Sequence, residues 1–216
     1  MGIQYFTGYK QSNKTIEQNV TALKQTNNMD VMAILLNKYL DDNLSSIEML
    51  KRIKGDYENA LSKGFTHVVP FSSGGSIYII ISEEAKAEKI AFLSPTLTPW
   101  NPIQNFKDRK KEGKEHSSGI VGKFTTKDVI TIFSYAREAK DKVDNLIGVP
   151  TLIIQGKEDE KIRPSGAIRL NKRLIHLDNT TPHELVLLDE GKHHLLSNNK
   201  TSEDTLRLIK DFFNKN

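Results

Sequence analysis

The chain has 216 residues, of which 37% are hydrophobic and 27% charged, and it contains no cysteine. This length suits one domain, spanning residues 1–216, with a single buried core. The lack of cysteine excludes disulfides, thiolate metal sites and a thiol nucleophile, and it agrees with a cytoplasmic location. No apolar run approaches the ~18 residues that cross a bilayer, so we expect no membrane partner.

The net charge of +4 comes largely from residues 107–114 (KDRKKEGK), where acidic residues interrupt the basic ones. No aromatic residue is interleaved with these charges, as a surface for single-stranded nucleic acid would require. We therefore expect a solvated loop at this segment and no nucleic-acid partner.

Apolar runs of strand length alternate along the chain with segments of helical period. The runs predict strands over residues 3–6, 31–36, 65–71, 90–93, 150–155 and 184–188. Helices are predicted over residues 14–25, 47–61, 77–81, 125–147, 165–173 and 202–213. Continuous apolar strands between helices are typical of a parallel sheet covered on both faces. The predicted fold class is α/β, a three-layer α/β/α arrangement around a mostly parallel sheet of about six strands.

Residues 77–81 (IYIII) favour a strand by propensity alone. A strand directly after the preceding glycine-rich turn would leave no crossover back to a parallel sheet. A buried helix is predicted there instead. Earlier in the chain, Ser45 and Glu48 form a capping-box pattern, and Gly64 is expected to end that helix in a left-handed conformation.

Three short polar segments each follow an expected strand, and together they indicate chemistry. They are residues 70–75 (PFSSGG), 156–159 (GKED) and 191–194 (GKHH). A nucleophile, an acid and a base in this order match the chain order Ser…Asp…His of one large hydrolase fold. Ser72 lies where a strand ends and a helix begins, and small residues follow it, as an exposed nucleophile requires. The alternative for this segment alone is an ordinary helix N-cap.

The acid and the base each have neighbours of the same type. Asp159 is preferred over the adjacent glutamates because Ile162 returns the chain to the core three residues later. His194 is preferred over His193 because Gly191 stands three residues before it and two leucines follow it. In this interpretation His193 faces solvent. A metal site on the two adjacent histidines is disfavoured because their side chains diverge.

These residues resemble the α/β-hydrolase superfamily, and within it small serine esterases and thioesterase-like acyl hydrolases. The resemblance extends over nearly the whole chain, and its most specific piece is residues 149–159 (VPTLIIQGKED), similar to the acid-bearing strand and loop. Residues 5–8 (YFTG) are similar to the family's oxyanion loop. The resemblance implies that the amides of Phe6 and Ser73 bind the tetrahedral oxyanion, and that no metal or organic cofactor is needed.

The chain departs from the family pattern at three places. Pro70 replaces the first glycine of Gly-x-Ser-x-Gly, and Gln4-Tyr5 replace the usual His-Gly of the oxyanion loop. Proline fixes φ and donates no hydrogen bond, so the turn before the nucleophile must be built differently. The chain also begins at the family's third strand, so the first two strands are missing and residues 31–36 become a sheet edge. An exposed apolar edge invites pairing, and we predict a homodimer through it.

The resulting hypothesis is a serine hydrolase that cleaves a small carboxylic ester or thioester. Ser72 attacks the carbonyl, His194 accepts the proton, Asp159 orients the imidazole, and an acyl-enzyme forms. Residues 94–124 are expected to form a short cap whose aromatic side chains line an acyl pocket or simply pack the cap: Trp100, Phe106 and Phe124. The alternatives are a catalytically inactive binding protein of the same fold and an acyltransferase that uses the same residues.

Overall fold

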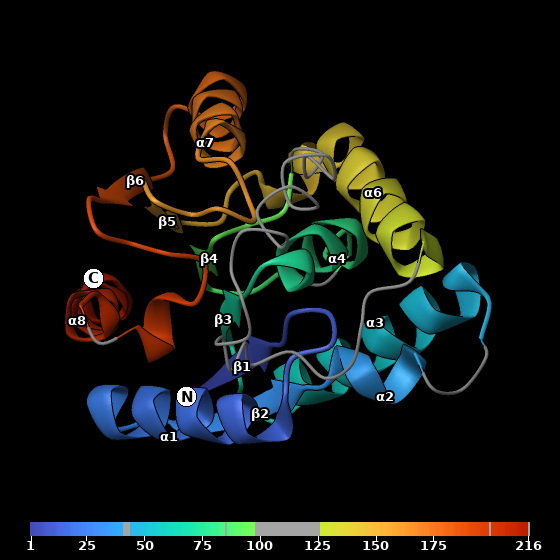
Figure 1. Cartoon of the computed structure of the whole chain (residues 1–216), viewed down its shortest axis with the longest axis horizontal. Helices are drawn as coiled ribbons and strands as arrows, with labels where there is room; N and C mark the ends of the chain where they lie inside the picture. Colours follow the sequence, from blue (N-terminus) through green and yellow to red (C-terminus); the bar gives the residue numbers. More distant parts are fainter. Residues whose placement is uncertain (41–43, 85, 98–125, 199, 216) are drawn as a thin grey trace, which may run out of the picture.

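The computed structural model describes residues 1–40, 44–84, 86–97, 126–198 and 200–215. In these ranges a parallel sheet of six strands forms the middle layer, in the order β2-β1-β3-β4-β5-β6 (Figure 1). The strands are β1 (Gly2–Phe6), β2 (Asp30–Ile34), β3 (His67–Pro70), β4 (Lys89–Leu93), β5 (Thr151–Gly156) and β6 (His183–Leu188). The predicted α/β class with a parallel sheet is confirmed.

The helices fall into two layers, one on each face of the sheet. Their bounds are α1 (Asn13–Asn27), α2 (Leu36–Leu40), α3 (Ser46–Ser62), α4 (Ser73–Ile81), α6 (Thr126–Asp141), α7 (Ser165–Leu177) and α8 (Ser202–Asn214), with 3₁₀ turns η1 (Val143–Leu146) and η2 (Leu195–Ser197). Helices α1 and α8 share a core cluster with one face, whereas α3, α4, α6 and α7 share a cluster with the other. Along β5, Ile153 belongs to the second cluster and its two neighbours to the first, as the alternation of side chains in a strand requires.

Several local predictions are confirmed. Residues 77–81 lie in α4, which is buried along its whole length between the sheet and α6. The capping box of Ser45 and Glu48 is present at the start of α3, and Gly64 has φ of +84°. Several bounds differ from prediction, among them those of one strand and one helix. The strand expected over residues 31–36 ends at Ile34, and the long helix expected up to residue 147 divides into α6 and η1.

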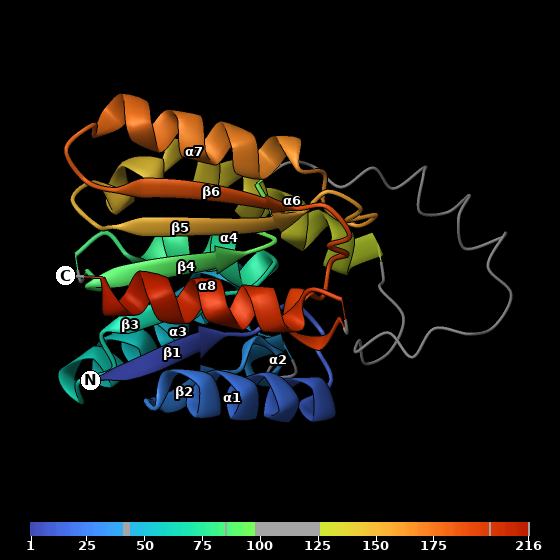
Figure 2. The same cartoon turned by 90° about the vertical axis from the view of Figure 1, so that its left-hand side faces the viewer.

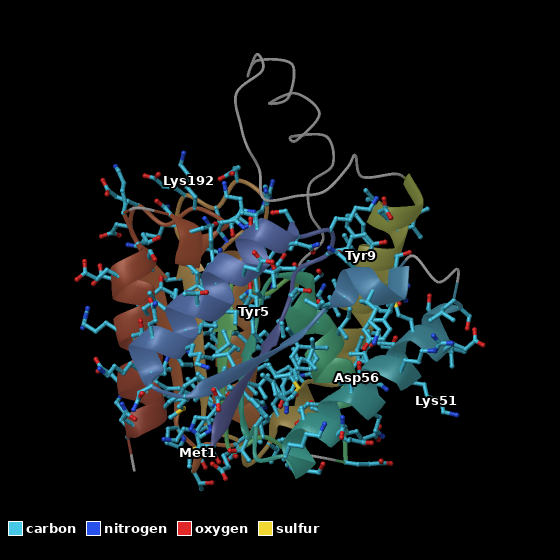
Figure 3. All side chains as sticks on the ribbon, turned by 90° about the horizontal axis from the view of Figure 1, so that it is seen from below. Met1, Tyr5, Tyr9, Lys51, Asp56 and Lys192 are labelled. Atoms are coloured by element: carbon cyan, nitrogen blue, oxygen red, sulfur yellow. The ribbon has the colours of Figure 1, made fainter. Side chains whose placement is uncertain are left out.

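All six strands point the same way, so their carboxyl ends share one end of the molecule (Figure 2). Figure 3 places Tyr9, after β1, and Lys192, after β6, toward that end, and Met1 toward the other. The expected site residues follow β3, β5 and β6 and therefore gather at the carboxyl edge, where open parallel sheets bind ligands.

Strand β2 is an edge strand, as predicted for residues 31–36. Its side chains from Val31 to Ala33 are half-buried. Pairing of two copies through this edge stays a prediction, which the molar mass measured by light scattering at micromolar concentration would test; a monomer mass would contradict it.

Among the described residues, no helix combines the length and the apolar character that a membrane span needs.

His67 lies at the amino end of β3, 2% exposed, with its ring 4.6 Å from that of Phe213. Burial lowers the pKa of His67 from 6.5 because the charged imidazole loses its hydration; Glu88 opposes the shift and Lys89 adds to it. The unfolded chain therefore binds a proton at a higher pH than the folded chain does. The contribution of His67 to the free energy of unfolding is therefore present above about pH 6.5 and is lost as the pH falls below it.

We predict that His67→Phe, which keeps a ring against Phe213, reduces the decrease in unfolding free energy as the pH falls from 7 to 5. A single proton taken up only on unfolding changes the free energy of unfolding by about 1.4 kcal/mol per pH unit. Urea unfolding at intervals between pH 5 and pH 7 measures the slope for both proteins. Equal slopes for wild type and variant would contradict the assignment.

Candidate active site

Ser72 occupies a strained turn between β3 and α4. Its backbone has φ of +53° and ψ of −122°, a conformation that non-glycine residues rarely adopt. The turn is closed by hydrogen bonds from the Gly74 amide to the Phe71 carbonyl (2.8 Å) and from the Ser72 amide to the Leu93 carbonyl (2.9 Å). A Cβ on Gly74 would lie 2.7 Å from the Thr7 carbonyl oxygen, so only glycine lets α4 approach β1 this closely. These features place the Ser72 hydroxyl at the carboxyl edge of the sheet.

Pro70 is accommodated by a gap in the sheet. The β3–β4 ladder pairs Val68 with Ile90 and then resumes as an isolated bridge between Phe71 and Leu93. Pro70 is still paired with Phe6 of β1, and the β3–β4 ladder, unchanged in register, is interrupted at the position that has no N–H to donate. Proline at this position is therefore compatible with the strained conformation of Ser72.

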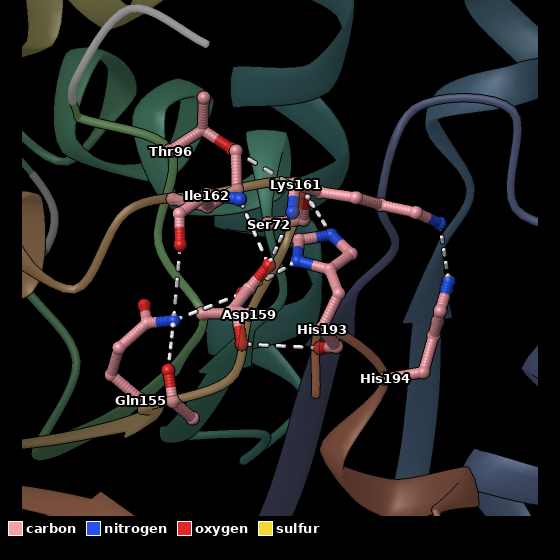
Figure 4. A network of polar contacts seen from close by, with 10 residues as sticks. Ser72, Thr96, Gln155, Asp159, Lys161, Ile162, His193 and His194 are labelled. Atoms are coloured by element: carbon pink, nitrogen blue, oxygen red, sulfur yellow. Dashed lines mark hydrogen bonds and ion pairs between the residues drawn. The ribbon is translucent and has the colours of Figure 1, made fainter. Parts of the chain in front are cut away.

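His193 connects Ser72 to Asp159. Its Nε2 lies 3.0 Å from the Ser72 Oγ and its Nδ1 lies 2.9 Å from the Asp159 Oδ2 (Figure 4). A carboxylate can only accept hydrogen bonds, so Nδ1 carries the proton, and in the neutral ring Nε2 accepts from the Ser72 hydroxyl. His193 is 6% exposed, and its ring packs on the Phe71 ring at a centroid distance of 5.1 Å.

Asp159 is held by donors on both carboxylate oxygens. The amides of Lys161 and Ile162 donate to Oδ1 at 2.9 and 2.8 Å, and the Gln155 side-chain amide donates to Oδ2 at 2.9 Å. Burial of the carboxyl raises its pKa, but the neighbouring His193 and the donors of Ile162 and Gln155 lower it by more, so the net shift is downward. Asp159 is therefore ionised at neutral pH and fixed in orientation.

The structure corrects the choice of His194 as the base. His194 points away from Ser72 and Asp159, and its Nε2 lies 3.4 Å from the Lys161 Nζ (Figure 4). Burial, with the charges of His193 and Lys161, lowers the pKa of His194 to about 3. The two imidazole rings lie at 81° to each other, and the carbonyl of His193 accepts a hydrogen bond from the Ser94 hydroxyl at 3.1 Å. This contact joins the backbone of His193 to the end of β4.

The acid loop and the histidine loop meet at two glycines, Gly156 and Gly191. A Cβ on Gly156 would collide with the backbone of Gly191, and a Cβ on Gly191 would lie 2.6 Å from the Gly156 Cα. The Glu158 amide donates to the Gly191 carbonyl at 3.0 Å, which joins the loops directly. The absence of both side chains brings Asp159 within reach of His193.

Of the two expected oxyanion donors, Ser73 directly follows Ser72 in the chain, and Phe6 lies in β1, paired with Pro70 of β3. Ser73 is the first residue of α4, where helix amides have no acceptor within the helix and the helix dipole favours negative charge. Phe6 ends β1, and its carbonyl accepts from the Phe71 amide at 3.0 Å. The amides of Thr7, Gly8 and Tyr9 donate to other groups of the chain: the Ile34 carbonyl, the Gln11 side chain and the Ser73 hydroxyl. The roles of the Phe6 and Ser73 amides stay predictions.

Several residues predicted for the site lie outside the part of the chain that the structure describes. The cap expected over residues 94–124 falls, from residue 98 onward, outside the described residues, and so do Trp100, Phe106 and Phe124. In the described ranges, no group of three or more His, Asp or Glu side chains is arranged to hold a metal ion.

Sequence reasoning did not identify several supporting residues. Gln155, Ser94 and Thr96 contact Asp159, His193 and Ser72 respectively. Each lies at or just past the end of β4 or β5, so position relative to the strand ends is the signal that could have found them. The sequence carries no comparable signal that separates His193 from His194.

Comparison with known proteins supports this fold. Residues 122–216 match the model of the Prolyl oligopeptidase family, a segment that contains Asp159 and His193 but not Ser72. No curated protein sequence matches the chain.

Solved structures match over almost the whole chain. A monoacylglycerol lipase from Paleococcus ferrophilus superposes with a TM-score of 0.68 at 12% identity, covering 98% of this chain and 93% of that one. A soluble variant of monoglyceride lipase from Saccharomyces cerevisiae gives 0.73 at 11% identity, covering 99% and 86%. A putative esterase from Staphylococcus aureus gives 0.70 at 11% identity, covering 100% and 76%. The chain has the α/β-hydrolase fold.

We predict that Gly156→Ala destabilises the protein because the added methyl group displaces the Gly191 backbone. Overpacking of this kind costs about 1–3 kcal/mol of unfolding free energy. Gly55 on α3 is the matched control, because a Cβ there meets no atom within 4 Å. Gly55→Ala should stabilise by about 0.5–1 kcal/mol. Urea unfolding measures both, and a Gly156→Ala protein as stable as wild type would contradict the close approach.

Proposed function

We propose that this protein is a serine hydrolase that cleaves a small carboxylic ester or thioester through Ser72, His193 and Asp159. The observation that carries the proposal is the position of the His193 ring, 3.0 Å from the Ser72 hydroxyl and 2.9 Å from the Asp159 carboxylate. The esterases and lipases among the similar structures support the same class of reaction. His193 replaces His194 in the role that the sequence assigned to the base.

The acylation step follows from these contacts. The Ser72 Oγ attacks the carbonyl carbon of the ester while His193 Nε2 takes the hydroxyl proton. Asp159 stabilises the imidazolium without accepting its proton, and the lowered pKa of its carboxyl suits that role. The tetrahedral intermediate then collapses, the C–O or C–S bond breaks, and His193 returns the proton to the departing alcohol or thiol. The acyl group remains on Ser72.

Deacylation reverses the proton path. Water enters, His193 Nε2 removes its proton, and the oxygen attacks the acyl carbon, which releases the acid and restores the Ser72 hydroxyl. We assign the oxyanion in both steps to the amide of Ser73 and, from the family resemblance, to that of Phe6. Removing one donor of this kind typically costs about 10²–10³ in rate.

The alternatives differ in what they require of the same residues. A binding protein without catalysis has no need for a histidine within hydrogen-bond distance of both a serine and a buried carboxylate, so this geometry favours the enzyme. Acyl transfer differs only in the group that attacks the acyl-enzyme. From the composition alone, we propose that the protein acts in the cytoplasm and has no nucleic-acid partner.

The two adjacent histidines provide the sharpest test of the assignment. With a series of nitrophenyl esters of increasing acyl length, His193→Ala should lower kcat by about 10²–10⁴, because the general base is removed. His194→Gln should keep kcat close to the wild-type value, because its ring contacts neither Ser72 nor Asp159. Circular dichroism of each variant checks that the fold is retained.

Either of two results would contradict the proposal. One is a His194→Gln protein that loses activity while His193→Ala retains it. The other is a folded wild-type protein that hydrolyses none of the esters at a rate above that of Ser72→Ala.

A further inference from the structure

A second strained residue lies beside Ser72. Ser94, directly after β4, has φ of +45° and is fully buried, and β3 and β4 are neighbours in the sheet. Its amide donates to the Ile154 carbonyl at 2.9 Å. A non-glycine residue persists in this region only where its surroundings determine the conformation, and such residues cluster at functional sites. A glycine would adopt this conformation without strain, so the presence of serine indicates a use for its side chain.

That side chain holds the histidine loop. The Ser94 hydroxyl donates to the His193 carbonyl at 3.1 Å, across 99 residues of sequence. The same carbonyl accepts from the Leu195 amide at 3.2 Å, in the turn that leads into η2. Ser94 is therefore the contact that ties the backbone of His193 to the end of β4.

Two residues later, Thr96 holds the nucleophile turn. Its amide donates to the Ser72 carbonyl at 3.1 Å, and its own carbonyl accepts from the Ser76 hydroxyl. Its Oγ1 lies 3.4 Å from the Ser72 Oγ, and the residue is 2% exposed (Figure 4). Because the Ser72 proton is directed to His193 Nε2, the Thr96 hydroxyl is the donor to Ser72 Oγ in the reactive arrangement.

We propose that residues 94–96 are a positioning element that sets the contact between Ser72 and His193. Both partners of that 3.0 Å contact are bonded to the same three-residue segment, Ser72 through Thr96 and His193 through Ser94. The strained turn at Ser94 aims its hydroxyl at the histidine loop while the chain continues to Thr96. This inference rests on the proposed function and adds two positioning residues to it.

The first experiment measures the second-order rate at which a fluorophosphonate labels Ser72. Ser94→Ala removes the hydroxyl and keeps the strain, whereas Ser94→Gly removes both. We expect labelling to slow by about 10-fold to 100-fold in each, since small misplacements of reacting groups cost up to this much. If Ser94 had only a structural role, the Ser94→Gly protein, which lacks the backbone strain, would be labelled at the wild-type rate. That result would overturn the proposal.

Matched variants extend the test to Thr96. Thr96→Val removes the hydroxyl at nearly constant volume and should slow labelling about tenfold, whereas Thr96→Ser should restore it. Ser82→Ala is the control, because Ser82 also donates from a buried hydroxyl to a backbone carbonyl, that of Ile79 at 3.3 Å, away from the site. Equal rates for Thr96→Val and Thr96→Ser would overturn the role of the hydroxyl.

A proton NMR spectrum separates failure of this inference from failure of the proposed function. The His193 Nδ1 proton, bonded to Asp159, should give a low-field signal in wild type that is lost or broadened in Ser94→Ala and retained in Ser82→Ala. A wild-type protein that is not labelled would refute the hydrolase, and the NMR comparison would then decide the positioning role alone. An unchanged signal in Ser94→Ala would overturn that role.

Discussion

The site depends on the contact between two backbones, at Gly156 and Gly191. Strands β5 and β6 are parallel neighbours, so their following loops leave the sheet side by side. Side chains at either glycine would hold the loops apart, and Asp159 and His193 could then not meet at 2.9 Å. The hydrogen bond from the Glu158 amide to the Gly191 carbonyl fixes the approach. The electrostatics of the site follow from it, because His193 is among the groups that lower the pKa of Asp159 against the effect of burial.

The position of Ser72 depends on the other half of the sheet. Ser72 follows β3 in a conformation with positive φ, and Gly74 lets α4 pack closely against the end of β1. The segment after β4 supplies the contacts of Ser94 and Thr96. Each strand thus contributes at its carboxyl end, and the core clusters on both faces of the sheet hold those ends in register. A rigid parallel sheet is what allows residues as far apart as Ser72 and His193 to keep a hydrogen-bond distance.

Much of this arrangement could be predicted from sequence, because it depends on local patterns. Apolar runs located the strands, and the need for a crossover identified residues 77–81 as a helix against their β propensity. Ser72 and Asp159 could be selected because each has one position relative to its strand end that suits its chemistry. The choice between His193 and His194 could not be made in this way. The ring that reaches Ser72 and Asp159 belongs to the residue whose carbonyl contacts Ser94, just past the end of β4, and neither composition nor spacing encodes that contact.

The effect of Pro70 is a second feature that the sequence alone could not predict. The sequence suggests that Pro70 disturbs the turn before Ser72, since proline lacks an amide proton. In the sheet it stays paired with Phe6 of β1, and the β3–β4 ladder is interrupted at Pro70 and resumes at Phe71 in the same register. Whether a residue disrupts a strand depends on which neighbour its amide faces, and that is a property of the assembled sheet.

The central claim is that Ser72, activated by His193, carries the acyl group. Its most direct test is rapid acid quenching of the protein with a nitrophenyl ester, followed by intact-mass measurement and peptide mapping. The claim predicts an added acyl mass on the peptide that contains Ser72, and no such mass in Ser72→Ala. Ester turnover with no acyl group on Ser72, or with an equal adduct in Ser72→Ala, would contradict it.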